Sequence, residues 1–242
     1  MSEGSVIILG GSGGIGAALA ARLSGGGTAV HLIGRDSAKL SAAAASLPGS
    51  VTTAIADVRD FDALNAAIEA APKPILGLAY AIGSIVLKPL KAATATDYAD
   101  AFYLNVTAAA LSVKAALPHF FPGAGVVLFS SIAAQVGFGN HAIIGAAKAG
   151  VEGLTRALAA ELSPNVRVNA IAPSLTDTPL AKMFTSNEAM AKSIAALHPI
   201  PRLGTADDSA ALAAFLLSND AAWITGEIIS VAGGRAHLRP KG

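Results

Sequence analysis

The chain of 242 residues contains no cysteine, which excludes disulfide bonds and metal sites built from thiolates. Its five histidines show neither HxxxH nor HExxH spacing, so we expect no metal site. Charged residues make up only 14% of the sequence, and the net charge of +1 argues against a surface that binds nucleic acid.

Long apolar runs are also lacking, since none approaches the roughly 20 residues of a membrane span. No basic segment follows Met1, so we expect a cytoplasmic protein without a secretory signal or membrane association. There is no linker-like break, charge run or internal repeat, and residues 1–242 are expected to form one domain. The low charge fits either a surface covered by partner subunits or a core built from alanine.

Short apolar runs typical of buried strands alternate with segments of helical apolar spacing. The expected strands are Val6–Leu9, Ala29–Ile33, Val51–Ile55, Ile75–Ala81, Val126–Phe129, Val166–Ile171 and Ile228–Val231. The expected helices are Ile15–Leu23, Ala38–Leu47, Phe61–Ala70, Thr96–Leu117 and Ala142–Leu162. This alternation predicts an α/β fold, in which a doubly wound, seven-stranded parallel sheet lies between two helical layers. Ligands bind such sheets beyond the carboxyl ends of the strands.

Glycines dominate the segment after the first expected strand. Gly11, Gly13 and Gly16 fit the spacing GxGxxG, whereas Gly10, Gly14 and Gly16 fit GxxxGxG. Either spacing lets a pyrophosphate approach free N–H groups at the start of the next helix, although an ordinary flexible turn is the alternative. The expected dinucleotide contacts here are Gly10, Ser12, Gly13, Gly14, Ile15 and Gly16.

A second segment begins at Ser131 and continues through Ile144 to Lys148. Its spacing resembles the active-site segment of the classical short-chain dehydrogenase/reductase (SDR) family, and the resemblance extends from Val6 to Gly234. It implies a Rossmann-type fold, an NAD(P) cofactor and redox chemistry between a carbonyl and an alcohol. Members of that family carry a tyrosine at the position of Ile144.

The resemblance implies a role for each member of this group. Ser131 would hold the substrate oxygen, and Lys148 would bind the nicotinamide ribose and lower the pKa of a tyrosine one helical turn away. Asn105 would hold a water that links the lysine to solvent. Ile144 has no ionisable or hydrogen-bonding side-chain atom, so the usual proton carrier is missing.

Two side chains are candidates for a substitute acid. His141 lies three residues before Ile144, where it also suits a pocket wall or the start of a helix. Tyr80 is a more distant candidate, and Tyr103 should point away from the helix face that carries Asn105. Two functions remain open: a weak NAD(P)-dependent oxidoreductase for a small carbonyl or alcohol, and a dinucleotide-binding protein that serves as a sensor or an oligomer partner.

The end of the second expected strand bears on the choice of cofactor. NAD-binding relatives usually carry an acid at the position of Gly34, whereas Arg35 suits the 2′-phosphate of NADP. Asp36 is a competing NAD signal, since it lies about twenty residues past the glycine loop, but a helix-capping role explains it better. NADP(H) is therefore favoured over NAD(H).

Other positions match cofactor contacts of the family. They are Asp57, Val58, Gly83, Lys148, Pro173, Thr176 and Thr178. Asp57 also suits the N-cap of the following helix. Both asparagines that usually precede Gly83 are missing, as is the threonine expected at Leu9, and Ser174 replaces a glycine.

Residues 179–199 occupy the position of the family's substrate lid. The apolar side chains expected to face the substrate are Leu180, Met183, Phe184, Met190, Ile194, Ile132, Ile144 and Leu175. They favour an apolar carbonyl substrate, unless they pack against the domain instead. The helices Thr96–Leu117 and Ala142–Leu162 form the dimer contact in the family, so we expect a homodimer or homotetramer.

Overall fold

The computed structural model describes residues 4–239, and seven parallel strands form its main sheet in the order β3-β2-β1-β4-β5-β6-β9. The strands are β1 Ser5–Leu9, β2 Ala29–Gly34, β3 Val51–Ile55, β4 Ile75–Tyr80, β5 Phe120–Phe129, β6 Val166–Pro173 and β9 Ile228–Val231. The order reverses between β1 and β4, which is the point where doubly wound sheets bind ligands. The predicted Rossmann-type α/β fold is therefore confirmed.

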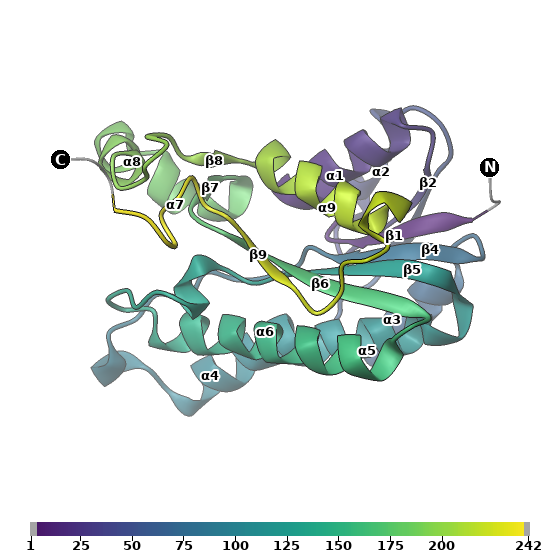
Figure 1. Cartoon of the computed structure of the whole chain (residues 1–242), viewed down its shortest axis with the longest axis horizontal. Helices are drawn as coiled ribbons and strands as arrows, with labels where there is room; N and C mark the ends of the chain where they lie inside the picture. The colour runs from purple at the N-terminus through teal and green to yellow at the C-terminus, as the bar shows by residue number, and fades with distance from the viewer. Residues whose placement is uncertain (1–3, 240–242) are drawn as a thin grey trace.

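Helices cover both faces of the sheet (Figure 1). The α-helices are α1 Gly14–Gly25, α2 Ser37–Ala45, α3 Phe61–Glu69, α4 Ala95–Phe102, α5 Ala108–Ala116, α6 Ala142–Leu162, α7 Lys182–Thr185, α8 Glu188–Ala195 and α9 Ala206–Leu217. Helices α1, α2 and α9 lie on one face, and α3, α5 and α6 lie on the other. Helix α9 was not expected from the sequence, although Thr205 and Asp208 form a capping box at its start.

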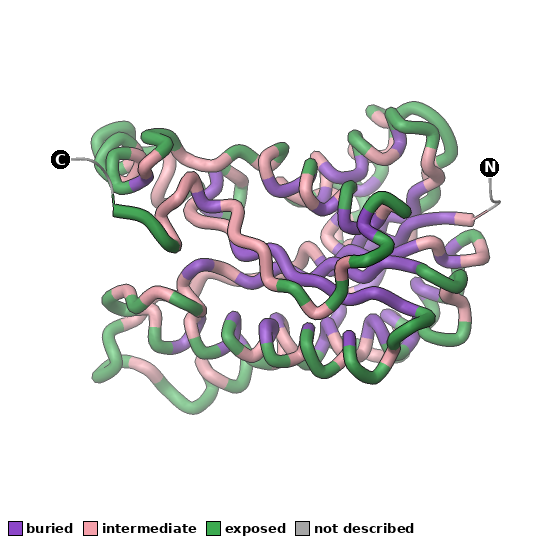
Figure 2. Tube along the Cα trace, in the orientation of Figure 1, coloured by how far each residue is buried: buried purple, intermediate pink, exposed green. Residues whose placement is uncertain are grey.

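Alternate residues of each strand face different helical layers. In β1, Val6 and Ile8 pack with α1 and α9, while Ile7 and Leu9 pack with α3, α5 and α6. Strands β1, β2, β4, β5 and β6 are accordingly buried along most of their length, as Figure 2 shows, whereas β3 and β9 at the sheet edges are less buried. Two apolar cores thus hold the sheet rigid between its helices.

One expected helix is interrupted. Instead of a regular helix from Thr96 to Leu117, the chain forms α4, a π-turn at Tyr103–Thr107 and α5. Such turns insert one residue into the hydrogen-bond ladder and are common at functional sites. The continuous helical stretch Ala95–His119 is long and apolar enough to cross a membrane by length and composition, and it packs against α3 and α6 in this fold.

The carboxyl ends of the strands meet at one end of the molecule, on the left in Figure 1. There the short strands β7 (Thr176–Asp177) and β8 (Gly204–Thr205) pair with each other. Helices α7 and α8, which occupy the predicted lid segment, lie between these two strands in sequence. This arrangement places residues 179–199 over the end of the sheet.

Candidate active site

A cavity of about 400 Å³ opens at the carboxyl ends of β4, β5 and β6. Several of the expected site residues line it: Ile15, Gly83, Ser131, His141, Ile144, Lys148, Pro173, Thr176 and Thr178. Asn105 lies buried beside it, whereas Arg35, Asp57 and Val58 do not contribute to its wall. The structure therefore gathers the candidate chemical residues around one cavity, and the residues expected to contact the adenine and the 2′-phosphate lie outside its wall.

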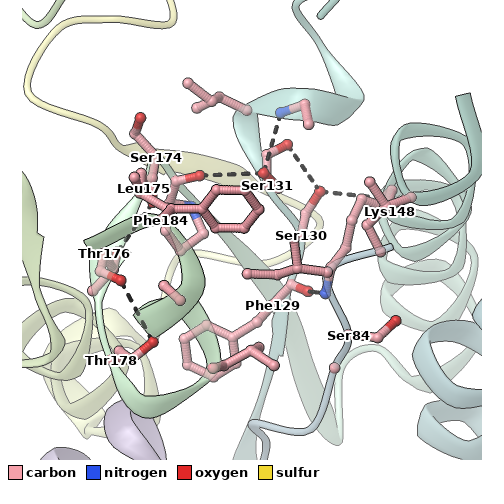
Figure 3. Close-up of a pocket in the computed structure, with 18 of the residues that line it drawn as sticks. Ser84, Phe129, Ser130, Ser131, Lys148, Ser174, Leu175, Thr176, Thr178 and Phe184 are labelled. Carbon is pink, nitrogen blue, oxygen red and sulfur yellow. Dashed lines mark hydrogen bonds between the residues drawn. The ribbon is translucent and has the colours of Figure 1, made fainter. Parts of the chain in front are cut away.

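Lys148 is anchored deep in this cavity. Its ammonium Nζ donates a hydrogen bond to the carbonyl oxygen of Phe129 at 2.8 Å (Figure 3). Only 8% of the residue is exposed, and this burial lowers the pKa of Lys148 to about 8. The lysine is thus held in place by the end of β5 without help from a tyrosine.

Ile144 lies one helical turn before Lys148 on α6 and is 5% exposed. Ser131 begins the short helical turn Ile132–Ala134, where its Oγ accepts from the Ala133 N–H at 3.2 Å and donates to the Pro173 carbonyl at 3.4 Å. A serine hydroxyl and a buried ammonium therefore share a wall with a hydrocarbon side chain.

The π-turn positions Asn105. Its Nδ2 donates to the Ala101 carbonyl at 2.9 Å, which a regular α-helix would pair with the N–H of residue 105, and to Ser84 Oγ at 3.3 Å. Its Oδ1 is buried and has no hydrogen-bond partner among the residues the structure describes. A Cβ at position 83 would lie 3.1 Å from this Oδ1 and 3.2 Å from Lys148 Nζ. Glycine at 83 thus lets both polar atoms border the same space.

Tyr80 is not available as an acid. Its hydroxyl donates to the Leu104 carbonyl at 2.7 Å, and burial in the core raises the pKa of the phenol. Tyr80, the more distant candidate for a substitute acid, is therefore not supported by the structure. Tyr103 points away from the cavity, as expected, and its hydroxyl donates to the Arg59 carbonyl at 3.2 Å.

His141 immediately precedes α6 and lines the cavity. Its Nδ1 lies 2.7 Å from the Gly139 carbonyl, an arrangement that favours the tautomer with its proton on Nδ1. Its ring is tilted against that of Phe138 with the centroids 5.3 Å apart. In this tautomer Nε2 is unprotonated, so His141 becomes an acid only when the imidazole is charged.

Sequence reasoning missed a buried carboxylate beneath the site. Glu152 lies one turn after Lys148 on α6 and accepts hydrogen bonds from Ser130 Oγ at 3.0 Å and Gln135 Nε2 at 2.9 Å. Ser130 Oγ also lies 3.1 Å from the Lys148 carbonyl. These contacts fasten the segment after β5 to the helix that carries Lys148. The spacing of four residues between Lys148 and Glu152 was the available signal.

A second missed pair joins the lid to the end of β6. His198 is 3% exposed, and its Nε2 lies 2.8 Å from Ser174 Oγ. Its Nδ1 lies 2.9 Å from the Ile194 carbonyl, so the Nδ1–H tautomer leaves Nε2 to accept from the serine. The serine that replaces the family's glycine therefore tethers the end of α8.

The lid contributes only part of the expected apolar wall. Leu180, Phe184 and Ile194 line the cavity together with Ile132 and Leu175. Met183 and Met190 do not, because they are 69% and 44% exposed.

The glycine loop meets the requirements of a dinucleotide site. Gly10 has φ +80, and a Cβ there would lie 2.9 Å from the Ala81 carbonyl oxygen, while a Cβ at Gly16 would overlap the Gly10 carbonyl. A Cβ at Gly14 would approach Thr178 Cγ2 to 2.6 Å. The three glycines of the spacing GxxxGxG are therefore sterically required, and so is Gly11, where a Cβ would lie 2.9 Å from Leu32 Cβ. No side chain caps the start of α1, which suits a helix terminus that receives a phosphate.

Gly34, the last residue of β2, lies close to the glycine loop. A Cβ at Gly34 would be 3.6 Å from Ser12 Oγ. Arg35 is exposed beside it. Asp36 is the N-cap residue directly before α2, and its side chain accepts a hydrogen bond from the Lys39 N–H at 3.0 Å. This confirms its capping role.

The capping alternative for Asp57 is wrong, because Asp60 is the N-cap of α3 and accepts from the Ala63 N–H at 3.0 Å. Asp57 instead accepts from the Arg59 N–H at 3.0 Å.

Comparisons with known proteins agree with this geometry. A family model described as Enoyl-(Acyl carrier protein) reductase matches residues 10–236. Dehydrogenase/reductase SDR family member 4 of Rattus norvegicus is 32% identical over 231 residues, which cover 91% of this chain and 83% of that protein. The chain belongs to the short-chain dehydrogenase/reductase family. Membership implies an oxidoreductase fold with an NAD(P) cofactor.

Other SDR proteins resemble the chain over different lengths. Tropinone reductase-like 3 of Erythroxylum coca is 44% identical over 131 residues, and this alignment spans 54% of the chain and about half of the relative, 51%. The structure of an SDR protein from Mycobacterium ulcerans superposes with a TM-score of 0.92 at 29% identity, covering 99% of this chain and 92% of that one. Levodione reductase superposes with a TM-score of 0.90 at 29% identity, covering 98% of each chain.

Proposed function

We propose that this SDR protein is an NADP(H)-dependent oxidoreductase that acts slowly on small apolar carbonyl compounds, because Ile144 stands where the family carries its tyrosine acid. The observation that carries the proposal is the shared cavity wall of Ser131, Ile144 and Lys148. Ketone reduction is favoured because similar proteins bear the names tropinone reductase-like and levodione reductase.

The bound cofactor would supply a hydride to the carbonyl carbon. The chain's own residues would do the rest: Ser131 Oγ donates a hydrogen bond to the substrate oxygen, and Lys148 binds the ribose hydroxyls. Ile144 cannot deliver the proton that the reduced oxygen requires. A general acid contributes about 10²–10⁴ to such a rate, so the reaction is expected to be slow.

Preference for NADP(H) rests on the surroundings of Gly34. No carboxylate side chain stands at that position, and Ser12 Oγ faces it as a hydrogen-bonding group. Arg35 is exposed next to it, where a guanidinium can form charge-assisted bonds to a 2′-phosphate. Asp36 is already committed to the N-terminus of α2.

The decisive experiment restores the acid. Ile144→Tyr places a phenol one turn from Lys148, and we expect it to raise NADPH-dependent reduction of a ketone or diketone at least about tenfold. Ile144→Phe is the matched control, because it adds the ring without the hydroxyl and should give no gain. Rates are followed as NADPH oxidation at saturating cofactor.

His141→Gln in the parent protein identifies the source of its residual proton. A loss of about tenfold or more assigns that role to the imidazole, and an unchanged rate assigns it to solvent.

The alternative is a protein that binds the dinucleotide and performs little chemistry, as a sensor or as a partner within an oligomer. It becomes the better description if Ile144→Tyr binds NADPH normally and still reduces no carbonyl in a broad panel. The panel includes an enoyl thioester, because the matching family model is described as an enoyl reductase.

For the assembly we propose a single-domain, cytoplasmic protein that forms a homodimer or homotetramer through α4, α5 and α6. Phe102 on α4 is 38% exposed and lies over Gly150 on α6, so the two helices present a joint apolar surface. Light scattering at micromolar concentration should give the mass of a dimer or tetramer, and a monomer would contradict this proposal.

A further inference from the structure

Arg235 enters the wall of the active-site cavity from the end of the chain that follows β9. Gly233 and Gly234 adopt φ values of 54 and 87, and the Arg235 N–H donates to the Ala232 carbonyl at 3.0 Å. A Cβ at Gly234 would lie 2.9 Å from Pro199 Cγ, so this turn packs closely against the end of the lid segment. The fold therefore fixes where Arg235 stands.

The guanidinium of Arg235 stacks on an aromatic wall. Its central carbon lies 5.0 Å from the centroid of the Phe138 ring, and that ring contacts His141. All three residues line the cavity that also holds Ser131 and Ile144. Stacking on one face leaves the edge N–H groups of a guanidinium free to bind an oxoanion in a bidentate manner.

No negative charge balances this cation within the described part of the chain. The cavity wall contains no aspartate or glutamate, and Arg235 forms no ion pair with a carboxylate among residues 4–239. Partial burial lowers the pKa of Arg235, although an arginine remains charged at neutral pH. Desolvating a cation without a partner is unfavourable. An anion that reaches Arg235 therefore binds with a more favourable free energy than it would at an exposed arginine.

Lys148 is the other cation of the wall, but one of its N–H groups bonds the Phe129 carbonyl at the end of β5, and the proposed reaction assigns the lysine to the ribose hydroxyls. Arg235 is therefore the cation that has no assigned task in the proposed reaction. The same cavity wall also contains apolar and aromatic side chains, including Leu175, Leu180 and Phe184. An apolar wall next to one unpaired guanidinium suits a ligand with a hydrocarbon body and an acidic end.

We propose that the substrate is an apolar carbonyl compound that carries an oxoanionic group, a carboxylate, and that Arg235 selects it by binding this group. The inference rests on the proposed function, because it names the substrate class of the same cavity. Arg235 acts as a specificity-determining residue, with the reacting carbonyl at Ser131 and the acidic end at the guanidinium.

The test compares matched substrates in matched variants. A series of unbranched oxo acids of graded length is assayed beside their methyl esters, with NADPH, in the parent protein and in the Ile144→Tyr background. We expect kcat/KM for the best acid to exceed that of its ester at least about tenfold. Arg235→Gln should remove this preference by lowering the value for the acid alone, and Arg235→Lys should retain much of it.

Affinity for NADPH serves as the control and should be the same in all Arg235 variants. Equal rates for acid and ester in the parent, or an equal loss for both in Arg235→Gln, would overturn the inference and leave the proposed function standing.

If no compound oxidises NADPH, binding decides instead. An oxo acid that raises the melting temperature of the NADP⁺-loaded parent, but not of Arg235→Gln, supports the substrate class while the proposed function fails. The absence of any such difference would overturn the inference.

Discussion

The two ends of the expected cofactor site differ in how closely their residues match the pattern of the SDR family. After β1, the chain has glycine at two positions where any side chain would collide with the backbone, Gly10 and Gly16. After β5, the serine and lysine are in place, yet the position between them is a buried isoleucine. Dinucleotide binding depends on backbone geometry, whereas proton transfer depends on one functional group. The comparison teaches that the two properties place separate demands on the sequence.

The largest effect is expected at the glycine loop. Gly10→Val forces a β-branched residue to φ +80 with its Cβ 2.9 Å from the Ala81 carbonyl oxygen. We expect this strain and overlap to reduce the free energy of NADPH binding by about 3 kcal/mol, so NADPH affinity should fall about a hundredfold. Fluorescence titration measures this loss. Gly27→Val is the control, since Gly27 also has a positive φ of +82 but nothing lies within 4 Å of a Cβ there, and an equal effect of both variants would remove the special role of Gly10.

The second prediction concerns the protonation of Lys148, at the end of the site that carries Ser131 and Ile144. Burial lowers the pKa of Lys148 to about 8, whereas the unfolded chain holds this proton up to the ordinary value of 10.5. Between these two pH values the unfolded state binds more protons, so the stability of the parent should rise with pH relative to Lys148→Met. The slope approaches at most about 1.4 kcal/mol per pH unit. Urea unfolding at pH 7.5, 8.5 and 9.5 tests it, and a constant difference between the two proteins would refute it.

The third prediction concerns the nucleotide end alone. Arg35→Ala should weaken NADPH binding about tenfold through the lost charge-assisted bonds, and it should leave NADH binding unchanged. Lys39→Ala is the matched control, because Lys39 is also exposed but pairs with Asp36 at 3.4 Å. Tighter binding of NADH than of NADPH by the parent would contradict the proposed cofactor preference.

The smallest effect is expected at Tyr80. Tyr80→Phe leaves the Leu104 carbonyl without its donor and should cost about 1–2 kcal/mol of unfolding free energy with no change in reduction rate. Tyr103→Phe, whose hydroxyl bonds at the surface, should cost less than about 0.5 kcal/mol. A loss of activity in Tyr80→Phe at unchanged stability would show that the phenol takes part in the chemistry.

The order of strands and helices could be predicted because apolar periodicity reports which faces are buried. The expected helix Ala142–Leu162 and the expected strands Val51–Ile55 and Ile228–Val231 have the bounds found in the structure. The position of Lys148 one turn after Ile144 was predictable from the i, i+4 geometry of a helix, whereas the place of Ser131 beside them was expected from the resemblance to the SDR family.

Other features depend on long-range contacts that local sequence does not reveal. The π-turn around Asn105 is stabilised by partners such as Ser84, which lies on another segment. Helix α9 has apolar residues on both sides because it packs between α1 and the sheet, and such a helix lacks the usual amphipathic pattern. Arg235 was overlooked because it lies directly after Gly234, where the resemblance to the family ends, and the turn at Gly233 and Gly234 carries it into the cavity.

The cavity wall begins at Ile15 and ends at Arg235, so it draws on nearly the whole length of the chain. During synthesis the glycine loop and strands β1 to β5 leave the ribosome well before β9 and the turn that follows it. Pairings between distant segments also form late in folding, because the chain must first close long loops. The cavity wall is therefore complete only after almost the whole chain has been made, and the residue proposed to select the substrate is the last part of the wall to be added.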